Sequence, residues 1–232
     1  GVCIFNIQNE EFSPFPVLDG IRVSYSLPDK NGNLWFTSFS GLYYYRVSDS
    51  TLSHYRHIPK DINSLGDDQL NMCYIDTQNE LWLATFNGVD RFDSASGNFY
   101  HYLRDINQRV HYQVYYITED DKSRLWIGVA NKGLYVLDRR KNTSNKPTLN
   151  LVLKGSANHL LIDDQNVLWI GNDLSLGIQR LQLNNFQIHS DFSVEHCMGT
   201  PGKFLSLSDN SISTIFKDRN KGIWIGTFAG GV

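Results

Sequence analysis

Three histidines, His54, His57 and His101, are the side chains of this 232-residue sequence with the most direct capacity for metal binding or acid–base chemistry. Two of them occupy matching places, since His54 follows Leu52 by two residues and His101 follows Phe99 by two. Matching places in strands of different sheets do not converge on one ion. No Gly-x-Ser-x-Gly elbow for a serine nucleophile occurs. The sequence therefore predicts no catalytic residue, no metal site and no cofactor.

Five aspartates form a second set with possible metal chemistry, and each stands six residues before a tryptophan. The aspartates are Asp29, Asp76, Asp120, Asp163 and Asp218, and the tryptophans are Trp35, Trp82, Trp126, Trp169 and Trp224. None begins the alternating acidic ladder, ending in Glu, of an EF-hand calcium loop. An aspartate at the start of a turn accepts backbone N–H bonds two residues on. We interpret these aspartates as turn residues and not as calcium ligands.

This pairing is part of a repeat that covers the whole chain. The tryptophans recur at spacings of 47, 44, 43 and 55 residues, inside apolar phrases such as Leu81-Trp82-Leu83. A glycine follows each tryptophan by six to eight residues, at Gly41, Gly88, Gly133, Gly177 and Gly230. Short segments rich in Val, Ile, Leu, Tyr and Trp alternate with Asp, Asn, Gly and Ser clusters, which predicts strands.

In the second repeat the predicted strands a to d cover 70–75, 81–85, 89–92 and 98–103. Four antiparallel strands repeated every 40 to 50 residues are typical of a β-propeller blade. The predicted fold is therefore all-β, a propeller of four-stranded blades with about five blade equivalents. A flat tryptophan at the centre of strand b suits the space between neighbouring sheets, so we expect all five tryptophans to pack there.

The blades are predicted within a single propeller segment, 1–232. Full blades are expected at 20–58, 67–104, 110–153 and 156–190, and half blades at 1–17 and 209–232. The two half blades either pair to close a five-bladed ring or belong to a chain cut from a longer ring. We favour the second alternative, a segment of a seven-bladed ring, because half blades expose sheet edges.

Composition excludes several classes of protein. A hydrophobic content of 41% with 13% aromatic residues fits a folded domain and not a disordered tail. The net charge of −3, without a block of Lys or Arg, predicts no contact with nucleic acid. No run of eighteen apolar residues occurs, so any membrane attachment is expected through a flanking helix outside this sequence. Cys3, Cys73 and Cys197 are too widely spaced for a disulfide framework or a Cys-x-x-Cys site.

Two phrases carry a resemblance to a known family. Asp-x-x-Gly-x-Leu-Trp-Phe-Thr at 29–37 and Asp-x-x-x-Gly-Ile-Trp-Ile-Gly-Thr at 218–227, with lead-ins at 64–65 and 206–212, resemble the two-component regulator propeller repeat. The resemblance implies the periplasmic sensor region of a hybrid two-component receptor of gut bacteria. Such receptors continue into an immunoglobulin-like domain, a membrane helix and a histidine kinase, often with a DNA-binding output, and act as homodimers.

Some repeats depart from this pattern. Asn172 replaces the usual Thr in the fourth repeat and the loop after it is lengthened, while Val129 takes that place in the third. The stretch from Asp191 to Phe204 explains the spacing of 55 residues as an insertion.

In a propeller the b–c loops and the d–a connections share one rim, where a ligand is expected. Aromatic rings with amides and a few charges suit a carbohydrate, although the rings can also simply pack loop against loop. The candidate ligand-binding residues are Phe39, Phe86, Asn87, Arg109, His111, Tyr112, Asn131, Lys132, Asn172, Asp173 and Phe228.

Three functions are compatible with these features. The first is a non-catalytic sensor domain that recognises an oligosaccharide or a related degradation product and controls transcription of the genes that use it. The second is a propeller enzyme similar to the streptogramin lyases, although no catalytic His and Glu of that family can be matched here. The third is a scaffold that binds protein partners.

Overall fold

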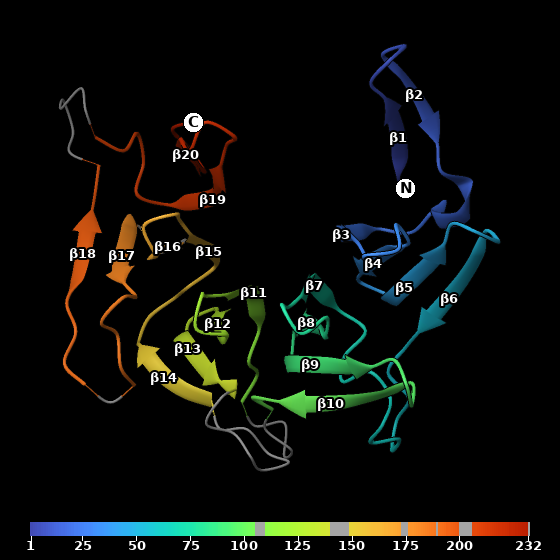
Figure 1. Ribbon diagram of the computed structural model, residues 1–232, viewed down its shortest axis with the longest axis horizontal. Coiled ribbons are helices and arrows are strands. Elements are labelled where there is room, and N and C mark those ends of the chain that lie inside the picture. The colour runs from blue at the N-terminus through green and yellow to red at the C-terminus, as the bar shows by residue number, and fades with distance from the viewer. Residues whose placement is uncertain (105–109, 140–148, 173–175, 189, 200–205, 232) are drawn as a thin grey trace. The chain divides into compact units, whose positions relative to one another are not determined.

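The computed structural model describes residues 1–104, 110–139, 149–172, 176–188, 190–199 and 206–231 (Figure 1). These residues form two compact units, Gly1–His111 and Tyr112–Val232, which are considered separately below. Among the described residues no helix has the length and apolar character needed to cross a membrane.

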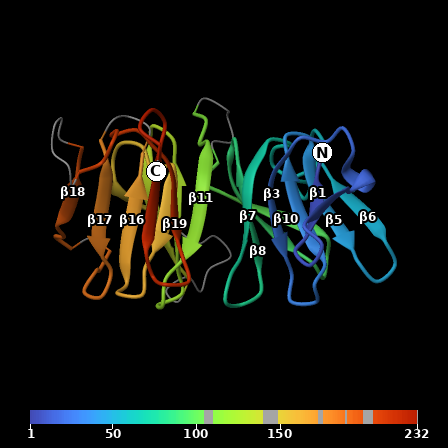
Figure 2. The ribbon, with the colours of Figure 1, turned by 90° about the horizontal axis from the view of Figure 1, so that it is seen from above.

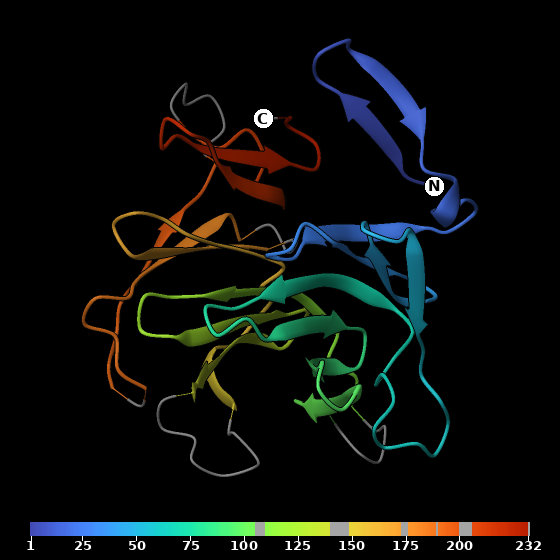
Figure 3. The same cartoon turned by 45° about the vertical axis from the view of Figure 1, so that its right-hand side comes forward.

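Unit 1 contains one two-stranded and two four-stranded antiparallel sheets (Figure 3). The first sheet pairs β1 (Cys3–Asn6) with β2 (Glu11–Pro14) and is followed by the 3-10 helix η1 (Pro16–Leu18). The second sheet contains β3 (Val23–Pro28), β4 (Leu34–Ser38), β5 (Gly41–Arg46) and β6 (Thr51–Tyr55). The third contains β7 (Leu70–Ile75), β8 (Leu81–Thr85), β9 (Gly88–Asp93) and β10 (Asn98–Tyr102).

Unit 2 contains two four-stranded sheets and one two-stranded sheet. The first consists of β11 (Val114–Glu119), β12 (Arg124–Val129), β13 (Gly133–Asp138) and β14 (Leu149–Leu153). The second consists of β15 (His159–Ile162), β16 (Val167–Gly171), β17 (Ile178–Gln182) and β18 (Val194–Cys197). The last pairs β19 (Ile212–Lys217) with β20 (Ile223–Thr227).

The predicted all-β fold of four-stranded antiparallel sheets is confirmed, and in the second repeat each predicted strand coincides with a strand to within a residue. The prediction for the fourth repeat ends too early. Its outer strand, β18, lies at Val194–Cys197 and pairs with β17, beyond the expected end at residue 190. The spacing of the tryptophans assigns residues 191–204 to an insertion, but residues 194–197 complete the sheet as β18.

Within each unit the sheets stack through their first strands. In unit 1 β3 contacts β7, and in unit 2 β15 contacts both β11 and β19. Within each unit equivalent strands of neighbouring sheets run side by side, so the connections of that unit gather at two opposite edges (Figure 2). We call these edges the turn edge, which carries the a–b and c–d turns, and the loop edge, which carries the b–c and d–a connections.

The repeated aspartate fixes every turn between strands a and b. Its Oδ1 atom accepts backbone N–H bonds from the residues two and four positions later, at 2.8–3.0 Å in all five repeats. This confirms the predicted turn role. The Oδ2 atom has a second role that the sequence pattern does not reveal. It accepts the indole N–H of the tryptophan six residues on, at 2.7–2.8 Å, for Trp82, Trp126, Trp169 and Trp224.

Trp35, Trp126 and Trp169 each pack against the following repeat of their own unit, as predicted. Trp35 contacts Phe92, with ring centroids 5.5 Å apart, and Trp126 contacts Phe186 at 5.0 Å. Trp169 packs against a cluster that includes Ile212 and Ile215. Trp126 is 0% exposed, whereas Trp224 is 54% exposed.

This contrast gives a stability prediction. Replacing Trp126 by Ala leaves a cavity between two sheets and a buried Asp120 without its indole donor, so we expect a loss of about 3–5 kcal/mol in the free energy of unfolding. Trp224→Ala removes the same side chain from an exposed position and serves as the control, with a loss below about 1 kcal/mol. Urea denaturation of both variants measures the difference. Equal losses would contradict the role assigned to the buried indole.

Candidate functional site

The b–c loops and the d–a connections are joined directly by backbone hydrogen bonds. In unit 1 Gly41 N donates to Asp68 O at 2.8 Å and Phe86 N donates to Gln69 O at 3.0 Å. In unit 2 the matching bonds run from Ala130 N to Gln113 O and from Phe228 N to Ser211 O, both at 3.0 Å. The expectation that these two kinds of connection share one edge is confirmed.

A hydroxyl three residues after the tryptophan shapes several b–c loops. The Oγ atom of Ser38 donates to Gly41 O and accepts from Ser40 N, and Thr85 makes the same pair of bonds with Gly88 and Asn87. Asn172 performs this role in the longer fourth loop, because its Nδ2 donates to Gly177 O and its Oδ1 accepts from Leu176 N. The replacement of Thr by Asn therefore has a structural reason.

Three of the predicted ligand residues meet at the loop edge of unit 1. The rings of Phe39 and Phe86 lie edge to face with centroids 5.8 Å apart, and the Arg22 guanidinium lies 4.8 Å from the Phe39 centroid. Phe39 retains 36% of its surface. Asn87, next to Phe86, is only 8% exposed, and its buried Oδ1 atom has no hydrogen-bond partner among the described residues. We call Phe39, Phe86 and Asn87, with Asp67 and Gln69 beside them, the unit 1 rim.

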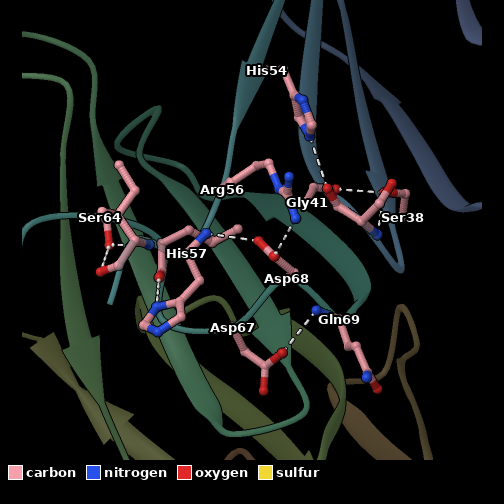
Figure 4. Close-up of polar contacts among 12 residues, drawn as sticks. Ser38, Gly41, His54, Arg56, His57, Ser64, Asp67, Asp68 and Gln69 are labelled. Carbon is pink, nitrogen blue, oxygen red and sulfur yellow. Dashed lines mark hydrogen bonds and ion pairs between the residues drawn. The ribbon is translucent and has the colours of Figure 1, made fainter. Parts of the chain in front are cut away.

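The d–a connection at 56–69 is the longest described element of this rim, and its own polar groups hold it in place (Figure 4). The Asp68 carboxylate accepts from His57 N at 2.7 Å and from the Arg56 guanidinium at 3.2 Å. His57 Nδ1 lies 2.8 Å from Leu65 O, and Ser64 Oγ accepts from Ile58 N. His57 therefore organises a loop, and His54 does the same through Ser40 O, 2.8 Å from its Nε2 atom.

Asp67 is a rim residue that the sequence analysis missed. One carboxylate oxygen accepts from Gln69 N at 2.8 Å (Figure 4). Burial raises the pKa of Asp67, and the neighbouring carboxylates of Asp68 and Asp90 raise it further. The available signal was the shared lead-in, since Ser-Leu-x-Asp occurs at 64–67 and again at 206–209. Asp209 accepts from Ser211 N in the same way.

An ion pair between the buried Asp90 and the partly buried His101 holds the same connection. Asp90 is buried and accepts from Gly66 N at 2.6 Å and from His101 Nδ1 at 2.7 Å, while His101 Nε2 lies 3.0 Å from Ile62 O. Because both ring nitrogens face acceptors, this geometry requires the doubly protonated imidazolium. Burial lowers the pKa of His101, but the hydrogen bond and charge of Asp90 outweigh that effect and raise the pKa.

The other predicted rim residues lie in unit 2, at the end of unit 1 or outside the described residues. Asn131, Lys132 and Phe228 are exposed in unit 2, and the Tyr112 ring lies 6.4 Å from that of Tyr135. His111 is exposed at the end of unit 1. Asn172 is fully buried and its side-chain amide bonds Gly177 O and Leu176 N, so it is a structural residue of its loop and not a candidate ligand contact. Arg109 and Asp173 lie outside the described residues.

The thiols and carboxylates of the described part of the chain do not gather into a metal-type cluster. No group of three or more His, Cys, Asp or Glu side chains there is arranged to hold a metal ion. Cys73 is buried, and desolvation raises the pKa of its thiol to about 12, which keeps it protonated.

We predict that the His101 anchor makes stability depend on pH. The pKa is raised in the folded state, so the stabilisation is fully present below the unfolded value of about 6.5 and is lost as the pH rises through the folded pKa. His101→Gln should therefore destabilise the protein more at pH 5.5 than at pH 8.5. The expected difference is below about 1 kcal/mol, because solvent screens this partly exposed ring.

Urea denaturation at the two pH values tests this, with His54→Gln as the matched control. His54 occupies the same position of its outer strand but stacks on Tyr43 without a carboxylate partner among the described residues. A pH dependence that survives in His101→Gln, or that disappears equally in His54→Gln, would contradict the assignment.

Comparison with known proteins supports the family suggested by the repeat. Residues 206–229 match the family described as the two component regulator propeller. No curated protein sequence matches the chain. Among solved structures, the chain is similar to the extracellular domain assigned to a hybrid two component system of B. thetaiotaomicron, with 21% sequence identity and a TM-score of 0.81. The alignment covers 98% of this chain and 29% of that chain.

Two further solved structures are similar to this chain in fold. A second extracellular domain assigned to a hybrid two component system of B. thetaiotaomicron aligns with 22% identity, a TM-score of 0.54 and coverage of 96% of this chain and 36% of that chain. Virginiamycin B lyase from Staphylococcus aureus aligns with 14% identity, a TM-score of 0.63 and coverage of 88% and 63%. The propeller fold and the predicted resemblance to the two-component regulator repeat are thus confirmed, while the chain spans only part of each relative.

Proposed function

We propose that this chain is part of the periplasmic, ligand-recognising region of a hybrid two-component receptor. The observation that carries the proposal is that a repeat of this chain matches the two component regulator propeller while the fold resembles extracellular domains of hybrid two component systems. In this proposal the segment belongs to a seven-bladed ring in a homodimer, is non-catalytic, and is connected through a flanking membrane helix to a histidine kinase.

The proposed ligand is an oligosaccharide held at the unit 1 rim. Phe39 offers a partly exposed ring for the C–H face of a sugar, and Phe86 supports it from the side. Gln69 is joined to Phe86 by a backbone hydrogen bond and to Asp67 by its own N–H, and the side chains of Asp67 and Gln69 can pair with hydroxyl groups. Binding alone cannot transmit a signal, because a ligand shifts a receptor only through different affinities for two states. The proposal therefore requires a second domain or subunit that moves, and leads to transcriptional control of the genes that use the sugar.

A propeller lyase is the alternative with a specific observation in its favour, the fold likeness to virginiamycin B lyase. In unit 1, however, His54 on β6 bonds Ser40 O of the b–c loop, and His57 bonds Leu65 O of its own connection. A protein-binding scaffold is the third alternative. Turnover of a glycan would support the enzyme, and absence of binding to any glycan would support the scaffold.

We predict that Phe39→Ala weakens oligosaccharide binding about tenfold, since one aromatic stacking contact contributes about 1–1.5 kcal/mol. Calorimetry of this chain against a panel of plant and host glycans measures the effect. Phe216→Ala is the control, because it removes an exposed ring from β19, away from the loop edge. Equal binding by wild type and Phe39→Ala, or equal loss in both variants, would place the ligand elsewhere.

A further inference from the structure

The first repeat breaks the rule that joins each turn aspartate to its tryptophan. Asp29 Oδ2 accepts from the Tyr44 hydroxyl at 2.8 Å and from Asn33 Nδ2 at 3.1 Å, in place of an indole N–H. Tyr44 lies directly across from Trp35 in the β4–β5 pair, and their ring centroids are 4.2 Å apart. The corresponding positions in the second to fourth repeats hold Arg91, Val136 and Arg180. The Tyr44 hydroxyl therefore occupies the acceptor that the indole uses elsewhere.

The indole of Trp35 is consequently left without an acceptor. No described residue accepts a hydrogen bond from its Nε1 atom, although the side chain is only 7% exposed. The buried side-chain polar atoms without a partner in the described part are Asn87 Oδ1, Arg91 Nε and Arg180 Nε. Because Trp35 Nε1 is not among them, it retains contact with open space. Burial and the bond to Asp29 raise the pKa of Tyr44, which keeps its hydroxyl in the donating form.

Trp35 lines a pocket of about 440 Å³ at the turn edge of unit 1, between the β3–β6 and β7–β10 sheets. We call it the turn-edge pocket. Four rings line it: Trp35, Tyr44, Tyr55 and Phe92. Its volume falls in the range of small-molecule sites, and its lining combines these rings with seven polar or charged side chains. It lies at the edge opposite to the unit 1 rim, since its polar lining comes from the turns at Asp29–Asn31 and Asn79.

The charged side chains of the pocket are Asp29, Lys30 and Arg46, and its other polar groups are the amides and hydroxyls of Asn31, Ser53, Asn79 and Ser94. Asp29, the acidic residue of the lining, already accepts four hydrogen bonds, two at each oxygen. Arg46 makes one bond to Asp49, at 2.9 Å, and both side chains are about half exposed, which leaves other guanidinium N–H groups for a ligand. Lys30 adds a second positive charge. Among the lining residues two cations outnumber one carboxylate, and the guanidinium N–H groups that do not bond Asp49 favour a carboxylate ligand.

We propose that the turn-edge pocket binds a small molecule that joins a flat ring to a carboxylate, such as an aromatic acid. The ring would lie among Trp35, Tyr55 and Phe92, and the carboxylate would accept from Trp35 Nε1 and Arg46. The site is independent of the oligosaccharide proposed for the unit 1 rim, because the two share no residue.

Phenylacetate is a suitable probe, with phenylacetamide as its uncharged counterpart and acetate as the acid without a ring. The five indole N–H signals in a 1H–15N NMR spectrum of this chain provide a local readout, and Trp35→Phe assigns the signal of Trp35. We expect phenylacetate to shift the Trp35 signal selectively, phenylacetamide to bind about tenfold more weakly, and acetate to have no saturable effect.

Two variants test the contacts without removing the rings. Tyr44→Phe frees Asp29 for the Trp35 indole, as in the other repeats, so phenylacetate affinity should fall about tenfold. Arg46→Gln should have a similar effect, while Arg180→Gln, which removes a comparable arginine beside Trp169, should leave affinity unchanged.

The proposal is overturned if phenylacetate leaves the Trp35 signal in place, if it shifts all five indole signals alike, or if the acid and the amide bind equally. Unchanged affinity in both Tyr44→Phe and Arg46→Gln would also overturn it. None of these results would affect the oligosaccharide site, since that site is measured through Phe39.

Discussion

The structure depends on one carboxylate that serves two neighbours in each repeat. One oxygen of the turn aspartate closes the a–b turn through two backbone N–H groups, and in four repeats the other oxygen holds the indole six residues on. A buried indole N–H without an acceptor would cost about 1–3 kcal/mol, so the pairing allows a large ring to enter the space between sheets with its polar atom satisfied. The turn and the packing of the sheets are thereby set by the same residue.

The two edges of each unit are therefore stabilised by different interactions. At the turn edge, the aspartates hold the short turns that join strands a and b. At the loop edge, backbone bonds such as Phe86 N to Gln69 O tie the connections together, but the lengths of these connections vary freely. The 56–69 connection needs its own supports, from Asp68 within it and from Asp90 beneath it. Variation of surface chemistry is therefore tolerated at the loop edge without disturbing the sheets.

The sequence predicted features that recur, because recurrence separates them from drift. The strands of the second repeat, the turn aspartates and the pairing of loops at one edge follow from spacing alone. Features that depend on one particular side chain could not be predicted from the spacing of the repeats. The electrostatic interaction of Asp67 with Asp90 joins residues 23 positions apart, and β18 lies in a stretch that the spacing assigns to an insertion. The burial of Asn172 could not be inferred from its polar neighbours in the sequence. Such contacts become visible only when the strand register is known.

The same register explains why one tyrosine can change the chemistry of a repeat. The residue opposite the tryptophan on strand c is placed where its side chain can reach the turn aspartate, as the indole does. Arg180 at this place lies over the Trp169 ring and leaves the carboxylate to the indole, whereas Tyr44 donates to the carboxylate itself. The fold is maintained in both cases, because Asp29 keeps its full set of hydrogen bonds. What changes is that an indole N–H becomes free at the turn edge, so a repeat can acquire a polar pocket through a substitution that leaves its turn satisfied.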